Sequence, residues 1–455
     1  MKAVSIIEYG CLFCQSQGDL IVENASSRII DDKAFMALNS FISENTDNLI
    51  SNDKAFSIHR RKGIDFIRVK NYVGVIETAN HVIIEVLPKI CLQKTENEIE
   101  DTRRIFLKML RYLKNSPFTA IDNAHLNSQK FPILEVFITT FLNELEHLIK
   151  TGLKQFYRTE ESNQKFLKGK LDFKEHLRKN LIHKERFFTI FDEFTFNIPQ
   201  NRIIKTTLLF LKNKSGYPIN RSRIDNYLAV LEEIPASTNL TKEFNNINSL
   251  NRLFGSYDQI LKWAKVFLLN ESFVNYHGKA LNKAILFPME KIFEDYVAAG
   301  FRKYVEGNLR IQDKTHTLVE EHNGLGKFKI KPDLVIEINE YLIILDTKWK
   351  IIDENKPREN YQISQQDMYQ LYAYGKKYQQ NIDGNKKVML YLLYPLQVNF
   401  KKELPVFNYE TAKLESENLK LYVYPFDVQA CLETTIIKLS ERIKTNIKDL
   451  DVNII

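Results

Sequence analysis

The stretch from position 331 to position 350 reads Lys-Pro-Asp-Leu-Val-Ile-Glu-Ile-Asn-Glu-Tyr-Leu-Ile-Ile-Leu-Asp-Thr-Lys-Trp-Lys, and it decides the fold of the C-terminal part of the chain. Two apolar runs, 334–338 and 341–345, lie on either side of Asn339 and the glutamate that follows it. Asparagine tolerates a positive φ, so this pattern predicts two antiparallel strands joined by a two-residue turn.

The predicted hairpin brings two carboxylates face to face. A turn of two residues places Asp333 directly opposite Asp346, with their β-carbons about 4.5–5.5 Å apart. Two facing carboxylates repel each other, and a bound divalent cation resolves that conflict. Hard oxygen ligands on two strands suit Mg²⁺, or Mn²⁺ in its place. We therefore predict that Asp333 and Asp346 are catalytic residues that bind the metal.

Lys348 completes the predicted catalytic set. It lies two residues beyond Asp346 and hence on the same face of the strand. From there its ammonium group can orient or deprotonate a metal-bound water and offset negative charge on a phosphate. The competing interpretation is a surface hairpin in which Asp346 and Lys348 form an ordinary ion pair. The apolar run before Asp346 favours the site, because charges at the end of a buried strand need compensation.

Two flanking helices offer further candidates. The segment 289–297 has apolar residues at helical spacing, and Glu294 lies beside that apolar stripe, where it could point into the site. The residues from 364 to 367, Ser-Gln-Gln-Asp, resemble a capping box that opens a helix. That helix carries Gln370 and Tyr374 one turn apart, on one face. Glu294 and Gln370 are secondary catalytic candidates, the alternatives being a solvated helix residue and an amide at the edge of the core.

The pattern along the chain predicts a multidomain α+β protein, because 455 residues exceed the length of one ordinary domain. Short β-branched runs predict a β-rich domain over 1–95. Helical spacing predicts a mostly helical domain over 96–275, with a β-like insert at 187–196. Residues 276–455 mix both patterns. The predicted elements are strands at 66–70, 72–76, 81–87 and 388–393, and helices at 105–113, 133–145, 203–211, 250–269, 288–304 and 428–448.

Composition and charge place only broad limits on function. The net charge of +7 permits a nucleic-acid partner without requiring one. The four cysteines, at positions 11, 14, 91 and 431, include one C-x-x-C, whereas a structural zinc site needs about four ligands. We expect Cys11 and Cys14 to be half-buried thiols in an N-terminal strand. The absence of a signal peptide, of a disulfide framework and of an apolar run near ~18 residues predicts a soluble, cytoplasmic protein.

Several of these residues and motifs resemble those of known families. Asp333, Asp346-Thr-Lys348 and Gln370-x-x-x-Tyr374 resemble the PD-(D/E)xK nucleases, including the RecB-like branch. More of the chain resembles the McrC family, the nuclease subunits of McrBC modification-dependent restriction systems. The segments that carry this wider resemblance are Asn71-Tyr-Val-Gly-Val-Ile76, Ile84-Glu-Val-Leu-Pro-Lys-Ile90, Phe166-Leu-Lys-Gly-Lys-Leu-Asp-Phe173, Phe191-Asp-Glu-Phe-Thr-Phe-Asn-Ile-Pro-Gln-Asn-Arg202, Lys331-Pro-Asp333, Leu345-Asp-Thr-Lys-Trp-Lys350 and Met368-Tyr-Gln-Leu-Tyr-Ala-Tyr374.

The resemblance implies a C-terminal PD-(D/E)xK fold, a mixed central sheet flanked by helices, and a Mg²⁺-dependent endonuclease that cuts modified DNA in anti-phage defence. It also implies a partner, an McrB-like AAA+ ring that hydrolyses GTP, and it allows dimerisation within the complex. The N-terminal part of the family contacts this ring, so residues 1–95 are the expected contact. The chain itself has no G-x-x-x-x-G-K-[ST] motif.

Several residues within the resembling segments have no assigned role. Lys89 and Arg202 belong to this group, and the pieces around Gly169 and Asp192 can simply hold the middle domain together. The basic run at 59–62 is a candidate for the ring contact or for phosphates, although a solvated basic turn is the favoured interpretation.

Two alternative functions remain open. The chain could act mainly as a regulatory bridge that activates an AAA+ ring, with secondary or RNA-directed cleavage. It could also be a self-sufficient nuclease that needs no NTPase partner. Stimulation of a ring partner would favour the first alternative, and metal-dependent cutting by the isolated chain would favour the second.

Overall fold

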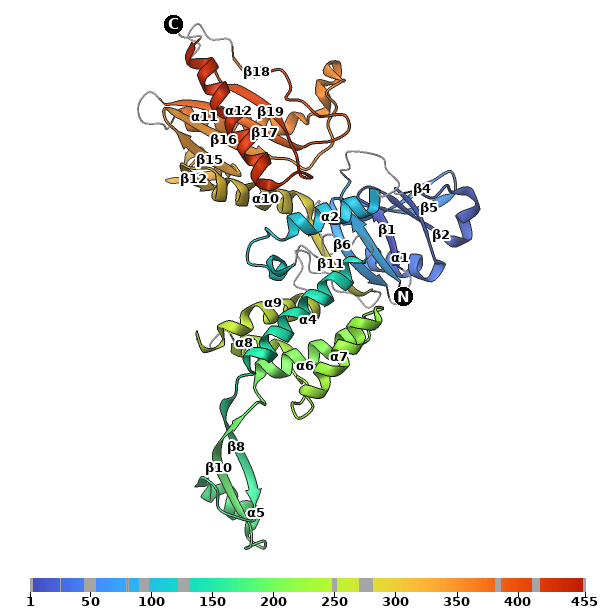
Figure 1. The fold of residues 1–455 in the computed structure, drawn as a ribbon, viewed down its shortest axis with the longest axis vertical. Helices are drawn as coiled ribbons and strands as arrows, with labels where there is room; N and C mark the ends of the chain where they lie inside the picture. The colour runs from blue at the N-terminus through green and yellow to red at the C-terminus, as the bar shows by residue number, and fades with distance from the viewer. Residues whose placement is uncertain are drawn as a thin grey trace. The chain divides into compact units, whose positions relative to one another are not determined.

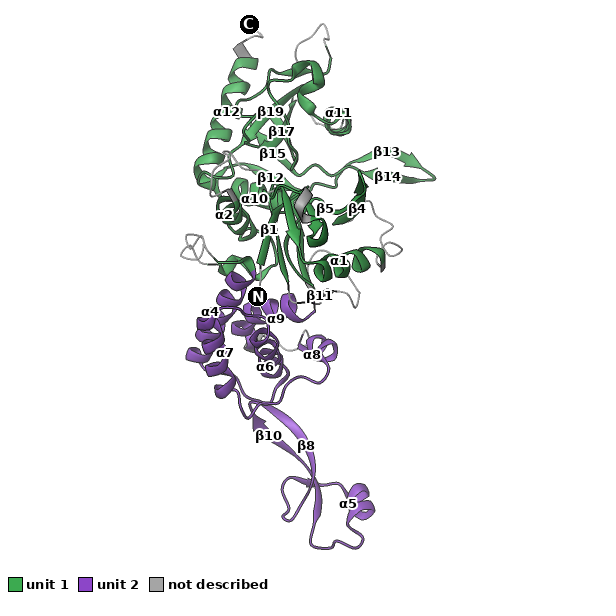
Figure 2. Cartoon of the chain, turned by 90° about the vertical axis from the view of Figure 1, so that its right-hand side faces the viewer, with its two compact units in different colours: residues 1–133, 272–455 green, residues 134–271 purple. Residues whose placement is uncertain are grey.

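A computed structural model describes residues 3–24, 26–44, 55–78, 80, 82–89, 98–121, 131–247, 252–269, 281–380, 386–410 and 418–452. The chain forms two compact units, shown in Figure 2. Unit 1 combines Met1–Ile133 with Ser272–Ile455, and unit 2 is Leu134–Glu271. Unit 2 is therefore inserted, in sequence, between the two halves of unit 1.

The N-terminal half of unit 1 contains two four-stranded sheets. In the first sheet, whose order is β1-β7-β6-β11, the strand β1 runs parallel to β7 and the other neighbours are antiparallel. The second sheet has the order β3-β2-β5-β4. The strands are β1 (Ala3–Ile7), β2 (Cys11–Cys14), β3 (Ser27–Ile30), β4 (Phe56–Arg61), β5 (Ile64–Val69), β6 (Tyr72–Thr78), β7 (Ile83–Leu87) and β11 (Leu281–Pro288), and the helices are η1 (Gln15–Leu20), α1 (Asp32–Glu44), α2 (Glu98–Leu110) and η2 (Pro117–Ala120).

The first sheet joins distant parts of the sequence. Its edge strand β11 follows unit 2, yet it pairs with β6 along most of its length. The helix α2 packs against β7 and β1. Helix α2 lies inside the range 96–275, which was predicted as the middle domain, but it packs against the N-terminal sheet of unit 1.

The C-terminal half of unit 1 is built on a six-stranded mixed sheet with the order β12-β15-β16-β17-β19-β18. The hairpin β15–β16 is antiparallel, and β16, β17 and β19 run parallel to one another. The elements are α10 (Met289–Tyr304), β12 (Asn308–Ile311), β13 (Thr317–His322), β14 (Leu325–Lys329), β15 (Leu334–Ile338), β16 (Tyr341–Thr347), η4 (Pro357–Gln362), α11 (Gln365–Gln380), β17 (Lys387–Pro395), β18 (Phe407–Asn408), β19 (Lys420–Phe426) and α12 (Leu432–Val452). The hairpin β13–β14 forms a separate two-stranded sheet.

Helices cover both faces of this sheet, as Figure 1 shows. Leu342 and Ile344 of β16 share a core with Leu371 and Tyr374 of α11. On the other face, α12 packs against α10, and Asn446 of α12 donates a hydrogen bond to the hydroxyl group of Tyr391. Because successive side chains of a strand point to opposite faces, the residue at position 346 faces α11.

The register of the β15–β16 hairpin confirms the sequence prediction. Leu334 pairs with Leu345 and Ile338 pairs with Tyr341, so the turn contains two residues. Asn339 has a φ of 53°, the positive value that favoured asparagine at this position. A strand or helix lies at each predicted range, but α2 begins at Glu98 instead of residue 105. The predicted helix at 250–269 is divided into η3 (Arg252–Tyr257) and α9 (Asp258–Leu268), and positions 81, 250 and 251 lie outside the described residues.

Unit 2 is a helical bundle that carries a long hairpin. The helix α6 packs against α7, α8 and α9, with Phe137, Phe141, Trp263 and Phe267 in the buried interior. The elements are α4 (Ile133–Thr151), β8 (Phe156–Gln164), β9 (Lys170–Leu171), α5 (Phe173–Asn180), β10 (Phe187–Thr195), α6 (Pro199–Lys212), α7 (Pro218–Val230), α8 (Leu240–Ile247), η3 (Arg252–Tyr257) and α9 (Asp258–Leu268). The predicted β-like insert corresponds to β10.

The hairpin of unit 2 leaves many apolar side chains uncovered. The strands β8 and β10 extend from the helices to the short helix α5, as Figures 1 and 2 show. We name one cluster the α5 apolar surface. It consists of Phe173, Leu177, Leu181 and Ile182, and each of these side chains is more than half exposed.

Several residues singled out by sequence have structural roles. Arg202 donates hydrogen bonds to Glu243 and Asn197, which ties the start of α6 to α8. Gly169 has a φ of +74°, and a β-carbon there would lie 2.4 Å from the carbonyl oxygen of Ile190. Asp192 accepts a hydrogen bond from Thr159 across the hairpin. The basic run at 59–62 is an exposed end of β4, in agreement with the favoured interpretation as a solvated turn.

The cysteines also follow the prediction where they are described. Cys11 and Cys14 are half-buried free thiols in β2, and Cys14 donates a hydrogen bond to Asp32. Cys431 is exposed and free, whereas Cys91 lies outside the described residues. In the part of the chain that the structure describes, no helix combines the length and the apolar character needed to cross a bilayer.

We predict that Gly74→Ala destabilises unit 1. Gly74 lies in β6 with a φ of +136°, and a β-carbon would come within 2.0 Å of the carbonyl oxygen of Ile285 in β11. The substitution should therefore lower the free energy of unfolding by about 3 kcal/mol, measured by chemical denaturation. The matched control is Gly63→Ala, whose φ is also positive but whose β-carbon meets open space. It should cost only about 1 kcal/mol, and equal losses in the two variants would contradict this account of β6.

Candidate active site

The structure brings all five predicted site residues to one cleft. Asp333, Asp346 and Lys348 come from the β15–β16 hairpin and its ends, Glu294 from α10, and Gln370 from α11. The cleft has a volume of about 650 Å³. Residues that lie within a segment of about 80 positions thus meet through the pairing of two strands and the packing of two helices.

Asp333 is held in place by the residue between the other two hairpin candidates. Its Oδ2 atom accepts hydrogen bonds from the backbone nitrogen of Thr347, at 2.7 Å, and from the Thr347 hydroxyl group, at 2.6 Å. The backbone carbonyl of Asp333 accepts a hydrogen bond from the backbone nitrogen of Gln312. The position of this carboxylate therefore depends on the register of the hairpin as well as on its own strand.

Asp346 and Lys348 form an ion pair. The side chain of Asp346 is almost completely buried, while that of Lys348 keeps 17% of its surface exposed. The backbone nitrogen of Lys348 donates a hydrogen bond to the carbonyl of Leu393 at 2.9 Å, which holds the residue beside β17 after β16 has ended. Lys348 therefore shares the cleft with Asp346, as the alternation along the strand predicted.

The electrostatics of the pair follow from burial. Burial, together with the nearby Asp346 and Glu294, raises the pKa of Asp333 to about 8. Burial also raises the pKa of Asp346, although the adjacent Lys348 opposes this change. Both shifts express the same conflict, because two carboxylates in one buried site cannot both ionise without compensation.

Lys348 is a cation in this arrangement. Burial alone would lower the pKa of Lys348, but the attraction of Asp346, with smaller effects of Asp333 and Asp367, outweighs burial and raises the pKa above its usual value. A protonated amine donates hydrogen bonds and cannot accept a proton. Of the two functions considered for Lys348, orienting water and offsetting negative charge therefore suits the structure better than deprotonating water.

Glu294 points toward the beginning of the first hairpin strand. Its carboxylate accepts a hydrogen bond from the side-chain amide of Gln312 and forms an ion pair with Lys291 at 3.2 Å. Gln312 in turn binds the backbone of Asp333. Glu294 is thus close enough to raise the pKa of Asp333 and is already engaged with neighbours.

Gln370 and Tyr374 form the predicted pair on one face of α11. The Gln370 amide donates a hydrogen bond to the Tyr374 hydroxyl group at 2.6 Å. That hydroxyl group lies 3.3 Å from the carbonyl oxygen of Lys331, to which it donates. The pair therefore connects α11 to the chain two residues before Asp333.

Asp367 and Lys350 are members of the cleft that sequence reasoning missed. Asp367 was interpreted as the far end of a capping box, but its carboxylate accepts hydrogen bonds from Lys350, at 2.9 Å, and from the Tyr394 hydroxyl group. Two sequence signals could have identified them. Lys350 continues the alternation of Asp346 and Lys348, and Asp367 precedes Gln370 by about one helical turn.

The donor set fits a hard divalent cation with an incomplete protein shell. In the described part of the chain, no group of three or more His, Cys, Asp or Glu side chains is arranged to hold a metal. Asp333 and Asp346 supply two carboxylates, and Mg²⁺ commonly takes one or two together with several waters. The buried Oδ2 atom of Asp346 has no hydrogen-bond partner among the described residues besides its ion pair with Lys348. The raised pKa of Asp333 is the feature that a cation would relieve.

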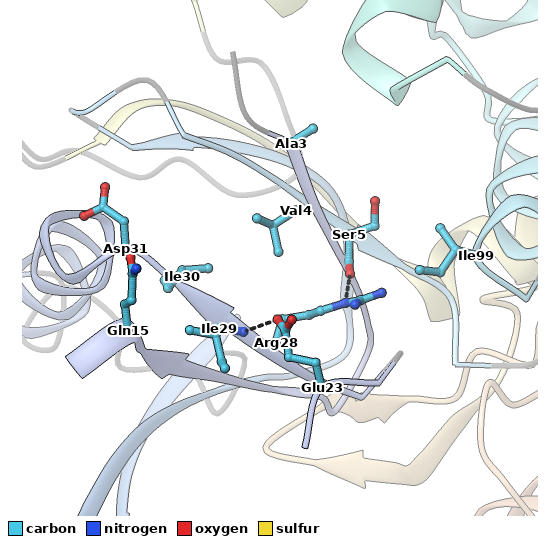
Figure 3. Close-up of a pocket in the computed structure, with 10 residues that line it drawn as sticks. All are labelled: Ala3, Val4, Ser5, Gln15, Glu23, Arg28, Ile29, Ile30, Asp31 and Ile99. Carbon is cyan, nitrogen blue, oxygen red and sulfur yellow. Dashed lines mark hydrogen bonds between the residues drawn. The ribbon is translucent and has the colours of Figure 1, made fainter. Parts of the chain in front are cut away.

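A second cavity, of about 670 Å³, lies in the N-terminal half of unit 1 (Figure 3). Its charged residues bind the backbone around it. The Arg28 guanidinium group donates to the carbonyl of Ser5 at 3.0 Å, and Glu23 accepts from the backbone nitrogen of Ile29 at 2.9 Å. These contacts support the chain itself.

Residues 67–395 match the family model described as McrBC 5-methylcytosine restriction system component, and the chain belongs to this family. The match covers β6, β7 and β11 of the first sheet, unit 2 and the cleft. The predicted resemblance to McrBC systems is confirmed. No curated protein matches the chain.

Solved structures extend the comparison to the fold. One similar chain belongs to the refined half-complex from a tetradecameric assembly of Thermococcus gammatolerans McrB AAA+ hexamers with bound McrC. The TM-score is 0.67 at 18% sequence identity, over 97% of this chain and 100% of that chain. A second comes from the cryo-EM structure of the Thermococcus gammatolerans McrBC complex, with a TM-score of 0.48 at 18% identity over 68% of this chain and 90% of that one. At this identity the first likeness establishes a shared fold.

We predict that metal-free protein loses stability as the pH rises through the pKa of Asp333. An acid whose pKa is higher in the folded state than in the unfolded state favours folding at low pH, and this contribution disappears as pH rises through the folded-state pKa. The window therefore runs from about pH 4, the unfolded value, to about pH 8. Asp333→Asn keeps an acceptor for Thr347 and cannot ionise. In chelator at about pH 9, it should be more stable than wild type by roughly 1–2 kcal/mol, measured by chemical denaturation.

The control for this experiment is Glu340→Gln, which neutralises an exposed carboxylate in the turn of the same hairpin. It should leave the pH dependence of stability unchanged. A wild-type protein whose stability is constant or rises between about pH 5 and pH 9 would contradict the assignment of a raised pKa to Asp333.

Proposed function

We propose that this chain is the Mg²⁺-dependent endonuclease subunit of an McrBC-like restriction complex, with a PD-(D/E)xK nuclease domain in its C-terminal part. One observation carries the proposal. Two carboxylates, that of half-buried Asp333 and that of buried Asp346, share a cleft with the charged Lys348, in a chain that belongs to the McrBC family. The reaction would be the hydrolysis of a DNA phosphodiester.

The metal site would be formed by Asp333 and Asp346. A Mg²⁺ ion, or Mn²⁺, bound there supplies Lewis-acid chemistry that activates water and neutralises charge on the phosphate. Thr347 orients Asp333 through two hydrogen bonds, so the ligand does not need to reorganise when a cation arrives.

Lys348 would act on the attacking water and on the phosphate. Its ammonium group donates hydrogen bonds that orient the water and offset the charge that develops on the phosphoryl oxygens. Gln370 and Tyr374 hold the chain before Asp333, and Glu294 supplies a third carboxylate at the edge of the cleft. Gln370 and Glu294 are secondary catalytic candidates, since their described contacts are with other protein groups.

We also propose an AAA+ GTPase ring as the partner, together with DNA that carries modified bases. The similar Thermococcus gammatolerans assembly consists of McrB AAA+ hexamers with bound McrC, which supports this proposal. The absence of a P-loop motif from this sequence agrees with a division of labour in which a partner hydrolyses the nucleotide.

Two surfaces of the chain are candidates for the contact with the ring. The resemblance favours residues 1–95, where the turn at 59–62 is exposed and basic. The α5 apolar surface is a candidate because its apolar side chains are exposed, with Leu181 at 73% and Ile182 at 86%. Exposed apolar clusters mark protein-binding sites more often than solvated charges do, so we favour the α5 apolar surface.

The alternative functions share part of this proposal. A regulatory bridge with secondary or RNA-directed cleavage would still need the ring contact, whereas a self-sufficient nuclease would need only the cleft. The carboxylate pair favours a nuclease over a bridge without cleavage, since a purely mechanical role gives no reason to bring two like charges together in one cleft.

We predict that Lys348→Ala abolishes cleavage while the stimulation of the partner's GTPase is retained. Loss of the ammonium group removes the stabilisation of developing negative charge, so cleavage of methylated DNA by the complex in Mg²⁺ should fall at least about 100-fold. The matched control is Lys401→Ala, which removes an exposed lysine of the same half of unit 1. Undiminished cutting by the Lys348→Ala complex would refute the catalytic assignment, and cutting by the isolated wild-type chain would support the self-sufficient nuclease.

We predict that the full chain binds an AAA+ protein encoded beside it and accelerates its GTP hydrolysis. The Lys348→Ala chain should be used so that cleavage does not interfere. A fragment ending at residue 275 would be unsuitable because it lacks β11, an edge strand of the first sheet. Introducing two charges with Leu181→Asp and Ile182→Asp should reduce GTPase stimulation at least about tenfold, as expected for a desolvated contact. Arg60→Ala with Arg61→Ala is the comparison, and a larger loss in that variant would assign the contact to residues 1–95.

A further inference from the structure

Two residues of the N-terminal sheet reach the segment that carries Lys348. Trp349 is completely buried, and its indole Nε1 atom donates a hydrogen bond to Oε2 of Glu8 at 2.9 Å. The backbone carbonyl of Trp349 accepts a hydrogen bond from Nζ of Lys89 at 3.0 Å. Glu8 and Lys89 thus bind both the side chain and the main chain of one residue, and we call these three residues the Trp349 clamp.

The first sheet explains why Glu8 and Lys89 lie together. Glu8 directly follows β1, and Lys89 follows β7 after a single proline. The two strands are parallel, so they end at the same edge of the sheet. The backbone nitrogen of Glu8 donates to the carbonyl of Leu87 at 2.8 Å, and that of Lys89 donates to Oε2 of Glu8 at 3.0 Å. The sheet therefore fixes both residues of the clamp.

The Trp349 clamp buries the carboxyl group of Glu8, and burial of such a group is energetically unfavourable. Glu8 is 2% exposed, and its Oε1 atom has no hydrogen-bond partner among the described residues. Burial raises the pKa of the Glu8 carboxyl group, although Lys89 opposes this change. Well-packed apolar residues of similar volume are often as stabilising as a buried charged pair, so stability alone does not account for this arrangement. Hydrogen bonds differ from apolar contacts in that they specify one position and one orientation.

The residues on both sides of Trp349 belong to the cleft. Lys348 forms the ion pair with Asp346, and Lys350 binds Asp367 through both carboxylate oxygens. The indole ring also packs against Phe293, with ring centroids 5.4 Å apart, and Phe293 directly precedes Glu294 in α10. A shift of Trp349 would therefore move Lys348 and Lys350 and would disturb the helix that carries Glu294.

We propose that Glu8 and Lys89 are positioning residues of the nuclease site, which hold Trp349 and thereby set the position of Lys348 relative to Asp346. The N-terminal sheet is then a structural part of the site, and Lys89 receives a role. This inference rests on the proposed nuclease function of the cleft. An error of about 1 Å in a catalytic group commonly costs about 100-fold in rate, so a positioning role has a measurable consequence.

The test compares Glu8→Ala and Lys89→Ala with wild type in the full chain, assembled with its partner, on methylated DNA in Mg²⁺. Each variant should lower kcat about 10- to 100-fold while KM for DNA changes less than about twofold, because both residues act on the site through Trp349. Glu8→Gln keeps an acceptor for the indole and should recover kcat to within about threefold of wild type. Glu85→Ala is the matched control. It removes a buried carboxylate of the same sheet that pairs with Arg103 and makes no contact with the clamp, so it should lower stability and leave kcat unchanged.

Hydrogen–deuterium exchange supplies a readout that does not depend on cleavage. The backbone nitrogen of Lys348 is bonded to Leu393, so loss of the clamp should accelerate exchange in a peptide covering 346–352 about tenfold, with no change in 199–212 of unit 2. Unchanged exchange and unchanged kcat in both alanine variants would overturn the proposal, as would an equal loss of kcat in Glu85→Ala. If wild type cuts no DNA while the alanine variants still accelerate exchange, the nuclease function fails and the clamp stands as a structural contact. In that case the positioning role in catalysis fails with it.

Fluorescence provides an independent check of the clamp. The chain has only two tryptophans, so Trp263→Phe leaves Trp349 as the sole indole emitter. In that background Glu8→Ala should shift the emission of Trp349, since the charged acceptor of its N–H group is lost, whereas Glu85→Ala should not. Identical emission spectra in the two variants would contradict the Glu8–Trp349 contact.

Discussion

Two carboxylates that face each other in a buried cleft cannot both carry their charge unless something positive joins them, and the C-terminal half of unit 1 is organised around this constraint. The pairing of β15 with β16 creates the conflict, because Leu334 pairs with Leu345 and the next residue along each strand is an aspartate, Asp333 and Asp346. The surroundings respond in two ways. Lys348 neutralises one carboxylate directly, and Thr347 donates two hydrogen bonds to the other. The remaining imbalance, visible in the raised pKa of Asp333, is the driving force that a cation would use.

The same constraint accounts for the polar groups at the rim of the cleft. Asp367 with Lys350, Glu294 with Lys291, and Gln370 with Tyr374 are each satisfied by a partner, so they add little free charge to the centre. Their value lies in geometry. Asp367 connects α11 to the end of the hairpin through Lys350. Tyr374 binds the carbonyl of Lys331, and Glu294 is linked to Asp333 through Gln312. Buried polar contacts of this kind contribute modestly to stability and strongly to a unique arrangement. The Trp349 clamp extends this principle from the C-terminal half of unit 1 to its N-terminal sheet.

The sequence predicted this site where the rules are local. Alternation with a period of two and an asparagine in the turn were enough to pair positions 333 and 346, and helical spacing paired Gln370 with Tyr374. The α+β class and most elements followed from the same periodicities. Asp367 was misinterpreted because a capping pattern is also local, and in this helix tertiary contacts with Lys350 and Tyr394 take its carboxylate.

Local sequence rules of this kind could not identify Glu8 and Lys89 as contacts of Trp349. Their contacts with Trp349 span 341 and 260 positions, and no periodic pattern links residues that far apart. The membership of β11 in the first sheet was hidden for the same reason, since unit 2 lies between it and its neighbour β6. Residues 1–95 could be recognised as β-rich from their composition. Their composition could not show that the first sheet also needs a strand that begins after residue 280.

The insertion of unit 2 into unit 1 also has a consequence for biosynthesis. A chain that emerges from the ribosome presents β1, β6 and β7 early, but β11 and the residues of the cleft appear only after unit 2 has been made. Domains tend to fold as units during synthesis, so unit 2, which is continuous, can fold while the first sheet still waits for its edge strand. The carboxylate pair and its clamp assemble last. Translation order thus delays the appearance of the cleft until most of the chain is available, so an incomplete chain lacks the site.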